Sequence, residues 1–280
     1  MTTPVLLLLL VLSNGLAMDS SRAASLQGDA IRFGSVAMDT PAMMHHRLAP
    51  LTDYLSHELG RPVVLKLSPD LKEAVNAVAD GNVELAYLTP VAYLRAHARS
   101  NAPLVVKTVT QGKGSFQLMI VVREDSPIRR IEDLAGKSFA FGDPAAVLQR
   151  AVVVGAGLPL ERLGKQAFLG HYDNIARAVV RGFYDPGILK DTTALKWQGR
   201  GLRILHTSAQ LPPYNITASS KVDRVLLEQV RQAFLRLDAG NPDHRAIIKA
   251  LDDEYDGFAA TGDAEYDIIR KLIEPFESRD

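Results

Sequence analysis

Two turns that are predicted to join a strand to a helix carry polar side chains suited to holding a small ligand. Asp39 and Thr40 follow an apolar run that begins at Ile31, and Thr89 follows the run 84–88. In an open α/β sheet, ligands lie beyond the carboxyl ends of the strands, where helix N-termini present free N–H groups. Asp and Thr are also common helix N-caps. Asp39, Thr40 and Thr89 are therefore predicted to contact a ligand, to cap their helices, or to do both.

A further polar pair, His171 and Tyr172, precedes a helix predicted over 173–181 and is expected to face the ligand from a second part of the chain. An isolated histidine usually makes a structural hydrogen bond, and a metal site needs further ligands. His45 and His46 are adjacent on one predicted helix and point about 100° apart, so they cannot hold one ion together. The sequence predicts no metal site and no cofactor.

The chain carries none of the motifs that would indicate catalysis. It has no Gly-x-Ser-x-Gly elbow, no P-loop, no His-Glu-x-x-His and no cysteine. The sequence 155–157, Gly-Ala-Gly, follows a predicted helix and not a strand, so it is not a dinucleotide fingerprint. Lysine plus arginine equals aspartate plus glutamate at 32 each, so no overall field attracts nucleic acid. The chain is predicted to be neither an enzyme nor a nucleic-acid-binding protein.

The elements that position these residues are short apolar strands alternating with amphipathic helices, the pattern of an α/β fold. The clearest helix begins at Asp39 or Thr40, has Pro41 in its first turn and ends at Gly60. The apolar run 116–123 is typical of a strand buried on both faces. Beyond residue 222 the pattern predicts three helices, over 222–237, 243–253 and 263–273.

This order of elements predicts two α/β lobes, the first of which is split in the sequence. Lobe one comprises 28–110 and 205–280, and lobe two comprises 111–204, with a strand over 202–207 that returns the chain to lobe one. Two crossings of this kind make a hinge. Small ligands commonly occupy the cleft between such domains.

Residues 1–27 are predicted to be a signal peptide and linker. The apolar run 5–12 is too short to cross a bilayer as a helix, and small residues such as Ala17 or Ala24 suit signal-peptidase cleavage. A buried N-terminal segment is the alternative. The expected location of the mature protein is the periplasm.

Several runs along the chain resemble the phosphate/phosphite/phosphonate substrate-binding proteins of ABC transporters. The matching runs are Ile31-Arg32-Phe33-Gly34, Leu85-Ala86-Tyr87-Leu88-Thr89-Pro90, Ile131-Glu132-Asp133-Leu134-Ala135-Gly136-Lys137 and Phe139-Ala140-Phe141-Gly142-Asp143-Pro144. The resemblance covers about 31–275. It implies a type II periplasmic-binding fold that closes on a ligand and delivers it to a membrane permease.

The resemblance also implies particular ligand contacts. Tyr93 matches a ligand-contacting tyrosine, and Asp185 matches an aspartate that meets the amino end or hydroxyls of the ligand. The alternatives are a packed aromatic for Tyr93 and a turn residue for Asp185. Ala146 and Val147 stand where the family carries a Ser-Thr-Ser-Gly-like run that holds phosphonate oxygens. The hydroxyl donors of that run are missing here.

We therefore expect a solute-binding protein with an altered oxyanion site, whose ligand is not a phosphonate but another anion, a zwitterion or a similar small solute. Its expected partner is an ABC permease. The alternative is a periplasmic sensor, in which the same two lobes work with a membrane receptor or kinase.

Overall fold

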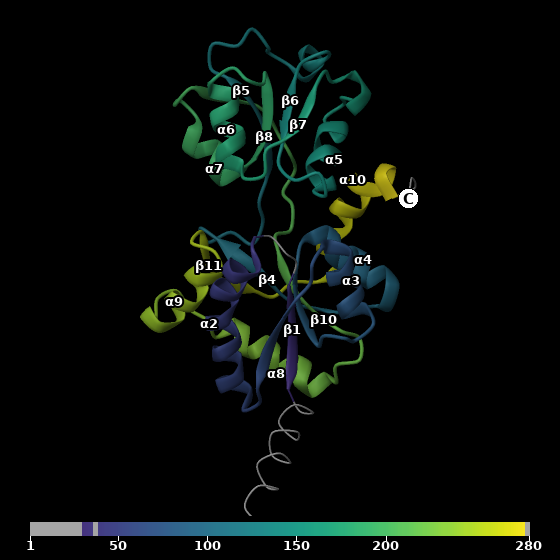
Figure 1. Cartoon of the computed structure of the whole chain (residues 1–280), viewed down its shortest axis with the longest axis vertical. Coiled ribbons are helices and arrows are strands. Elements are labelled where there is room, and N and C mark those ends of the chain that lie inside the picture. The colour runs from purple at the N-terminus through teal and green to yellow at the C-terminus, as the bar shows by residue number, and fades with distance from the viewer. Residues whose placement is uncertain (1–29, 36–38, 278–280) are drawn as a thin grey trace, which may run out of the picture.

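The computed structural model describes residues 30–35 and 39–277, which form two lobes joined by crossing segments (Figure 1). Lobe one holds a six-stranded sheet in the order β11-β4-β10-β3-β1-β2, and lobe two a five-stranded sheet in the order β7-β6-β8-β5-β9. The predicted two-lobed α/β fold is thus confirmed. The predicted signal peptide lies outside the described residues.

Each lobe packs helices on both faces of its sheet. The sheet of lobe one consists of β1 (Ile31–Ser35), β2 (Val63–Leu67), β3 (Leu85–Leu88), β4 (Leu104–Thr110), β10 (Asn215–Ala218) and β11 (Tyr255–Ala259). Its helices are α2 (Pro41–Leu59), α3 (Leu71–Ala79), α4 (Pro90–Ser100), α8 (Arg224–Leu235) and α9 (Pro242–Leu251). One core lies under α2, α8 and α9, and a second lies under α3 and α4.

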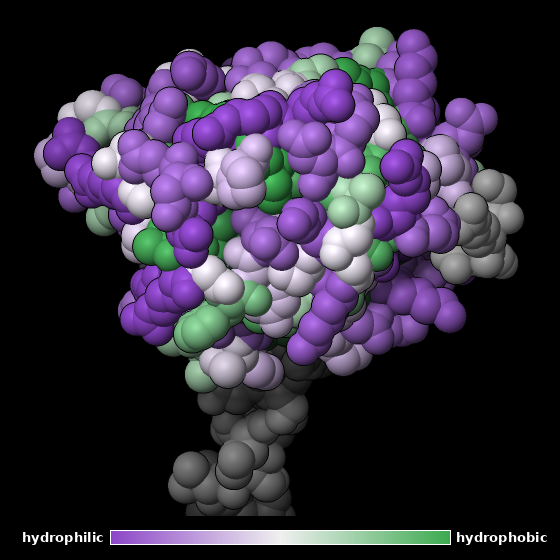
Figure 2. All heavy atoms as spheres, turned by 90° about the horizontal axis from the view of Figure 1, so that it is seen from above, coloured by the Kyte–Doolittle hydropathy of each residue, from purple (hydrophilic) through white to green (hydrophobic). Residues whose placement is uncertain are grey.

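Lobe two is built in the same way from the middle of the chain. Its strands are β5 (Leu118–Arg123), β6 (Phe139–Phe141), β7 (Gln166–Phe168), β8 (Pro186–Lys190) and β9 (Leu202–Thr207). Its helices are α5 (Val147–Gly155), α6 (Tyr172–Val180) and α7 (Asp191–Trp197). Figure 2 shows that hydrophilic residues dominate the face seen from the lobe-two end, with apolar residues in small separate groups.

Helix ends follow the side chains that can cap them. Thr40 Oγ1 accepts a hydrogen bond from the Met43 N–H at 3.4 Å, and Pro41 occupies the first turn of α2. Gly60 ends that helix in the left-handed conformation, with φ of 61°, which glycine adopts without a Cβ clash. The cap of α4 is similar, because Thr89 Oγ1 accepts from the Ala92 N–H at 3.1 Å.

The C-terminal helix α10 (Asp267–Glu277) contacts both lobes, and a short 3₁₀ turn, η3 (Asp263–Tyr266), leads into it. Ile269 and Ile273 are buried in a cluster that also contains core residues of lobe two. A Cβ added to Gly155 of α5 would lie 2.9 Å from Leu272 Cδ2, so the two helices approach closely there. The last helix, in yellow in Figure 1, thus joins lobe one to α5 of lobe two.

One part of the predicted organisation is wrong. Strand β9 does not return the chain to lobe one, because it pairs with β5 in the sheet of lobe two, and Leu202 is fully buried in that lobe's core. The predicted lobe boundary at 204/205 therefore falls inside a strand, and lobe one resumes after Thr207. The prediction also missed β10 and β11, two short strands inserted antiparallel into the first sheet.

No helix within 30–35 or 39–277 combines the length and the hydropathy needed to cross a membrane.

Candidate ligand-binding site

The hinge consists of two crossing segments that pair with each other. Phe116 and Leu211 exchange backbone hydrogen bonds of 2.9 and 2.8 Å between the end of β4 and the start of β10. Leu88 pairs with Asn215 next to this hinge, so the carboxyl end of β3 faces lobe two. Leu118 pairs with Lys190, so the carboxyl end of β8 faces lobe one. We call these two facing sheet edges the interlobe edges.

Most of the predicted ligand-binding residues lie at the interlobe edges. In lobe one they are Asp39, Thr40 and Thr89, and in lobe two Ala146, Val147, His171 and Tyr172. The three residues of lobe one all have local partners. Thr40 N–H donates to Asp39 Oδ1 at 2.7 Å, and Arg47 Nη2 lies 3.4 Å from Asp39 Oδ2. Helix capping therefore accounts for the structural contacts of all three.

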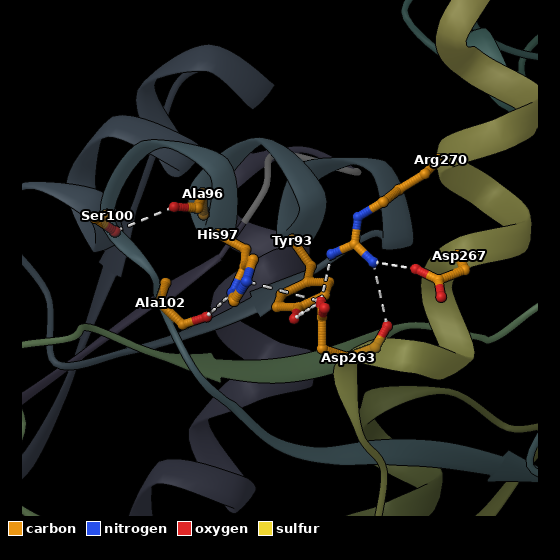
Figure 3. A network of polar contacts seen from close by, with 8 residues as sticks. All are labelled: Tyr93, Ala96, His97, Ser100, Ala102, Asp263, Asp267 and Arg270. Atoms are coloured by element: carbon orange, nitrogen blue, oxygen red, sulfur yellow. Dashed lines mark hydrogen bonds and ion pairs between the residues drawn. The ribbon is translucent and has the colours of Figure 1, made fainter.

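Tyr93 has a buried partner outside the interlobe edges. Its side chain is 1% exposed, and its hydroxyl donates to Asp263 Oδ1 at 2.5 Å. Arg270 Nη2 contacts the same carboxylate oxygen at 2.5 Å, and His97 Nε2 lies 3.9 Å from it (Figure 3). The Arg270 hydrogen bond helps to lower the pKa of Asp263 despite its partial burial, so the network holds a carboxylate. These contacts tie α4 to η3 and α10.

Asp185 lies at the opposite end of lobe two from the hinge. It directly precedes Pro186, which pairs with Val122 near the far end of β5. Asp185 Oδ2 accepts from Ser138 Oγ at 2.9 Å and from the Ser138 N–H at 3.2 Å. The structure therefore separates this exposed carboxylate from the other predicted residues and gives it the turn role that was the alternative.

The turn before α5, which we call the α5 turn (143–149), uses most of its own donors. The N–H groups of Ala146, Val147 and Gln149 donate to carbonyls of the same turn at 2.9, 2.9 and 3.3 Å. The cap residue Ala146 offers no side-chain oxygen. Gln149 is buried, and its amide accepts from the Gly142 N–H at 2.8 Å and contacts Tyr172 Oη at 3.4 Å. Its hydrogen-bonding groups therefore serve lobe two itself.

Three tyrosines that the sequence analysis did not select gather at the interlobe edge of lobe one. This tyrosine edge consists of Tyr87, Tyr214 and Tyr255. The hydroxyls of Tyr87 and Tyr255 lie 2.7 Å apart, and the rings of Tyr87 and Tyr214 stack with centroids 5.1 Å apart. Burial raises the pKa of all three, and Tyr172 of lobe two lies near enough to raise that of Tyr214 further. All three are neutral phenols at physiological pH.

Carboxylates surround the tyrosine edge from both lobes. Burial raises the pKa of Asp252, which also acts on all three tyrosines, and Asp143 of lobe two acts on Tyr214. Glu254 crosses between the lobes, since its Oε2 accepts from Lys190 Nζ at 2.7 Å and from Thr192 Oγ1 at 3.0 Å. Asp191 and Glu254 both act on Tyr172. The interlobe region is thus phenolic and rich in negative charge.

A larger hollow on lobe one lies elsewhere and holds none of the predicted residues. It measures about 560 Å³ between α2 and α8 and is lined by Glu58, Leu59, Arg224, Val225, Glu228, Gln229, Gln232 and Arg236. Leu59 ends α2 at the edge of the sheet opposite the hinge, where β2 begins. Over 30–35 and 39–277 no three His, Cys, Asp or Glu side chains converge in a way that could hold a metal ion.

Comparisons with known proteins agree with this architecture. Residues 33–266 match the family described as "ABC transporter, phosphonate, periplasmic substrate-binding protein". The phosphate-import protein PhnD of Mycolicibacterium smegmatis is 24% identical over 191 residues, which are 62% of this chain and 60% of that protein. The phosphonates-binding periplasmic protein of Escherichia coli is 25% identical over 126 residues, or 43% and 37% of the two chains. This chain therefore spans less than two thirds of the length of these curated relatives.

A solved structure shows the same fold. PhnD1 from Prochlorococcus marinus in complex with methylphosphonate superposes with a TM-score of 0.72 at 15% identity, over 89% of this chain and 98% of that chain. The family consists of binding proteins of transporters, in agreement with the prediction that this chain is not an enzyme. The chain belongs to the phosphonate-binding family of ABC-transporter periplasmic substrate-binding proteins.

Proposed function

We propose that this protein captures a small solute between its two lobes in the periplasm and presents it to an ABC permease, and that its oxyanion site is altered. The observation that carries the proposal is the meeting of strand ends and helix N-termini from both lobes beside one pair of crossing segments. Ligands of open α/β sheets lie at such positions. Membership of the family supplies the transporter as partner.

Capture works by closure of the lobes about the crossing segments. A ligand that contacts both interlobe edges stabilises the closed arrangement by as much as its affinity for that arrangement exceeds its affinity for the open one. The permease then meets a surface formed by two lobes in a fixed relative position. No chemistry on the ligand is required.

The α5 turn supports the altered oxyanion site. A phosphonate held there would need donors for its oxygens, and the side chains of Ala146 and Val147 have none. The N–H groups of Ala146, Val147 and Gln149 already donate within the turn. Each unsatisfied polar group costs about 1–3 kcal/mol on burial, so a phosphonate that lacks several donors binds weakly.

Thermal unfolding of the protein purified from periplasmic extract tests the proposal. A panel of methylphosphonate, phosphate, neutral solutes, amines and zwitterions is added to separate samples. A ligand at a hundred times its Kd stabilises the protein by about 2.7 kcal/mol. We expect such stabilisation from a member of the panel other than methylphosphonate or phosphate, together with a smaller radius of gyration by X-ray scattering.

Two results would overturn parts of the proposal. Strong stabilisation by methylphosphonate would show that the oxyanion site is intact. Stabilisation without compaction would show that the ligand does not close the lobes. A sensor role predicts the same capture with a different partner, so neighbouring genes separate the two: an ATPase and a permease support import, whereas a histidine kinase supports sensing.

A further inference from the structure

We infer that the solute bound between the lobes is a small organic cation, and that Tyr214 and Asp252 of lobe one select for its positive charge. This inference rests on the proposed function and specifies the ligand class of the same site. It follows from the aromatic rings, the balance of charge and an unpartnered buried hydroxyl at the tyrosine edge.

The rings provide surfaces for a cation. Tyr214 is half-buried, and Tyr87 covers one side of its ring at a centroid distance of 5.1 Å with an interplanar angle of 30°. Tyr172, also half-buried, approaches Tyr214 from lobe two. An ammonium group within about 6 Å of a ring centroid is attracted by the negative face of the ring, and more strongly where water is excluded. Closure of the lobes provides that exclusion.

The charges favour a cation over an anion. Asp143, Asp191, Asp252 and Glu254 act on the tyrosines of the interlobe edges, and Lys190, which is paired to Glu254, is the base that contacts this group. In the described part of the chain, Asp143, Asp191 and Asp252 form no ion pair with a Lys, Arg or His side chain. An anion placed here would meet three uncompensated negative charges, whereas a cation would neutralise part of them.

A buried hydroxyl at the same edge lacks a partner. Thr108 is 0% exposed, and its Oγ1 has no hydrogen bond, although it lies close enough to Tyr255 to affect the pKa of that phenol. Its backbone N–H donates to the Tyr214 carbonyl at 2.9 Å, which ties Thr108 directly to the tyrosine edge. Buried hydroxyls without partners are rare in folded proteins, and those that occur are commonly part of a binding site. The same edge thus combines charge, aromatic faces and unused hydrogen-bonding capacity.

Calorimetric titration with matched probes tests the inference. The probes are choline and ethanolamine, each compared with its uncharged isostere in which carbon replaces the nitrogen. The wild-type protein is expected to bind at least one of the two ammonium compounds about tenfold or more tightly than its isostere. Tyr214→Leu and Asp252→Asn are each expected to weaken the ammonium compound about tenfold and to leave the isostere unchanged.

Two further variants separate a specific effect from misfolding. Tyr214→Phe keeps the ring and is expected to retain most of the affinity, because cation–π attraction needs the ring face and not the hydroxyl. Asp185→Asn removes an exposed carboxylate at the far end of lobe two and is expected to bind like the wild type. Circular dichroism confirms that each variant is folded before titration.

The possible failures are distinguishable. Equal binding of an ammonium compound and its isostere, or binding of an anion or a neutral solute while neither ammonium compound binds, overturns the inference and leaves lobe capture intact. If no solute in the wider panel compacts the protein, the proposed function fails and the inference fails with it. Equal losses in Asp252→Asn and Asp185→Asn would also contradict the assignment, because only one of these carboxylates lies at the tyrosine edge.

Discussion

The α5 turn and the tyrosine edge face the same interlobe region, but they differ in what they offer a ligand. In the α5 turn, three N–H groups bond within the turn and Gln149 bonds to Gly142 and Tyr172. The tyrosine edge holds phenol rings, the Asp252 carboxylate and a hydroxyl without a partner. The comparison indicates that ligand recognition has moved from a helix N-terminus of lobe two to the antiparallel strands of lobe one.

The largest effect is expected outside both regions, at the Tyr93 network. Tyr93→Phe removes the hydrogen bond to Asp263, and hydrogen bonds to charged groups contribute about 1.5–3 kcal/mol. Asp263 is 44% exposed, so water replaces part of the interaction and the expected loss is about 1.5 kcal/mol by urea denaturation. Ligand affinity should be unchanged. A large loss of affinity at unchanged stability would instead make Tyr93 a ligand contact and weaken the contrast between the two regions.

A smaller effect is expected from restoring a hydroxyl to the α5 turn. Ala146→Ser places a side-chain oxygen at the N-cap of α5, where serine stabilises a helix by about 0.5–2 kcal/mol relative to alanine. We expect a gain near 0.5 kcal/mol, because ψ of 73° at this position is not that of a usual N-cap. Methylphosphonate binding should improve measurably by calorimetry.

Ala145→Ser is the matched control for that substitution. It adds the same hydroxyl one residue before the N-cap, at an exposed position. If both variants bind methylphosphonate no better than the wild type, missing hydroxyls at the α5 turn do not explain weak phosphonate binding, and the comparison of the two regions loses one of its terms.

The smallest effect is expected from Asp252→Asn on stability without ligand. Burial raises the pKa of Asp252, Glu254 and Asp253 add to the rise, and Lys190 and the Glu254 N–H oppose it. The folded state therefore holds the proton more tightly than the unfolded state, and the stability of the wild type falls as pH rises through the raised pKa. Asp252→Asn should be slightly more stable than the wild type at pH 7 by urea denaturation.

That difference should vanish below the ordinary aspartate pKa of 3.8, where both side chains are neutral in both states. A variant less stable than the wild type at pH 7 would show that the carboxylate serves the fold rather than the ligand. Gain of stability together with loss of cation binding is the pattern that sharpens the contrast with the α5 turn.

Local sequence signals predicted the elements that carry their own punctuation. Thr40, Pro41 and Gly60 predicted the limits of α2, and Thr89 predicted the start of α4, because caps depend on nearby backbone groups. The order of strands and helices, with the family resemblance, gave the two-lobed fold. These features depend on short-range hydrogen bonding and on hydrophobic periodicity, both of which are visible in the chain.

The tyrosine edge could not be predicted in the same way. Tyr87, Tyr214 and Tyr255 are distant in sequence and meet only because β10 and β11 insert antiparallel beside β3 and β4. Both strands are short, and β11 contains Gly257 at φ of 152°, so neither shows a clear alternating pattern. Asp185 was selected by family position, although the pairing of β8 with β5 turns that end away from lobe one.

The contact between α10 and α5 also fixes an order of folding. Tyr266, Ile269 and Ile273 complete a cluster that includes Phe139, Phe141 and the buried face of α5, yet α10 lies at the end of the chain. Synthesis proceeds from the N-terminus, so the middle third of the polypeptide must wait for the last residues before its apolar surface is fully covered. The protein therefore stays incompletely packed until its synthesis ends, a state suited to passage through a translocation channel.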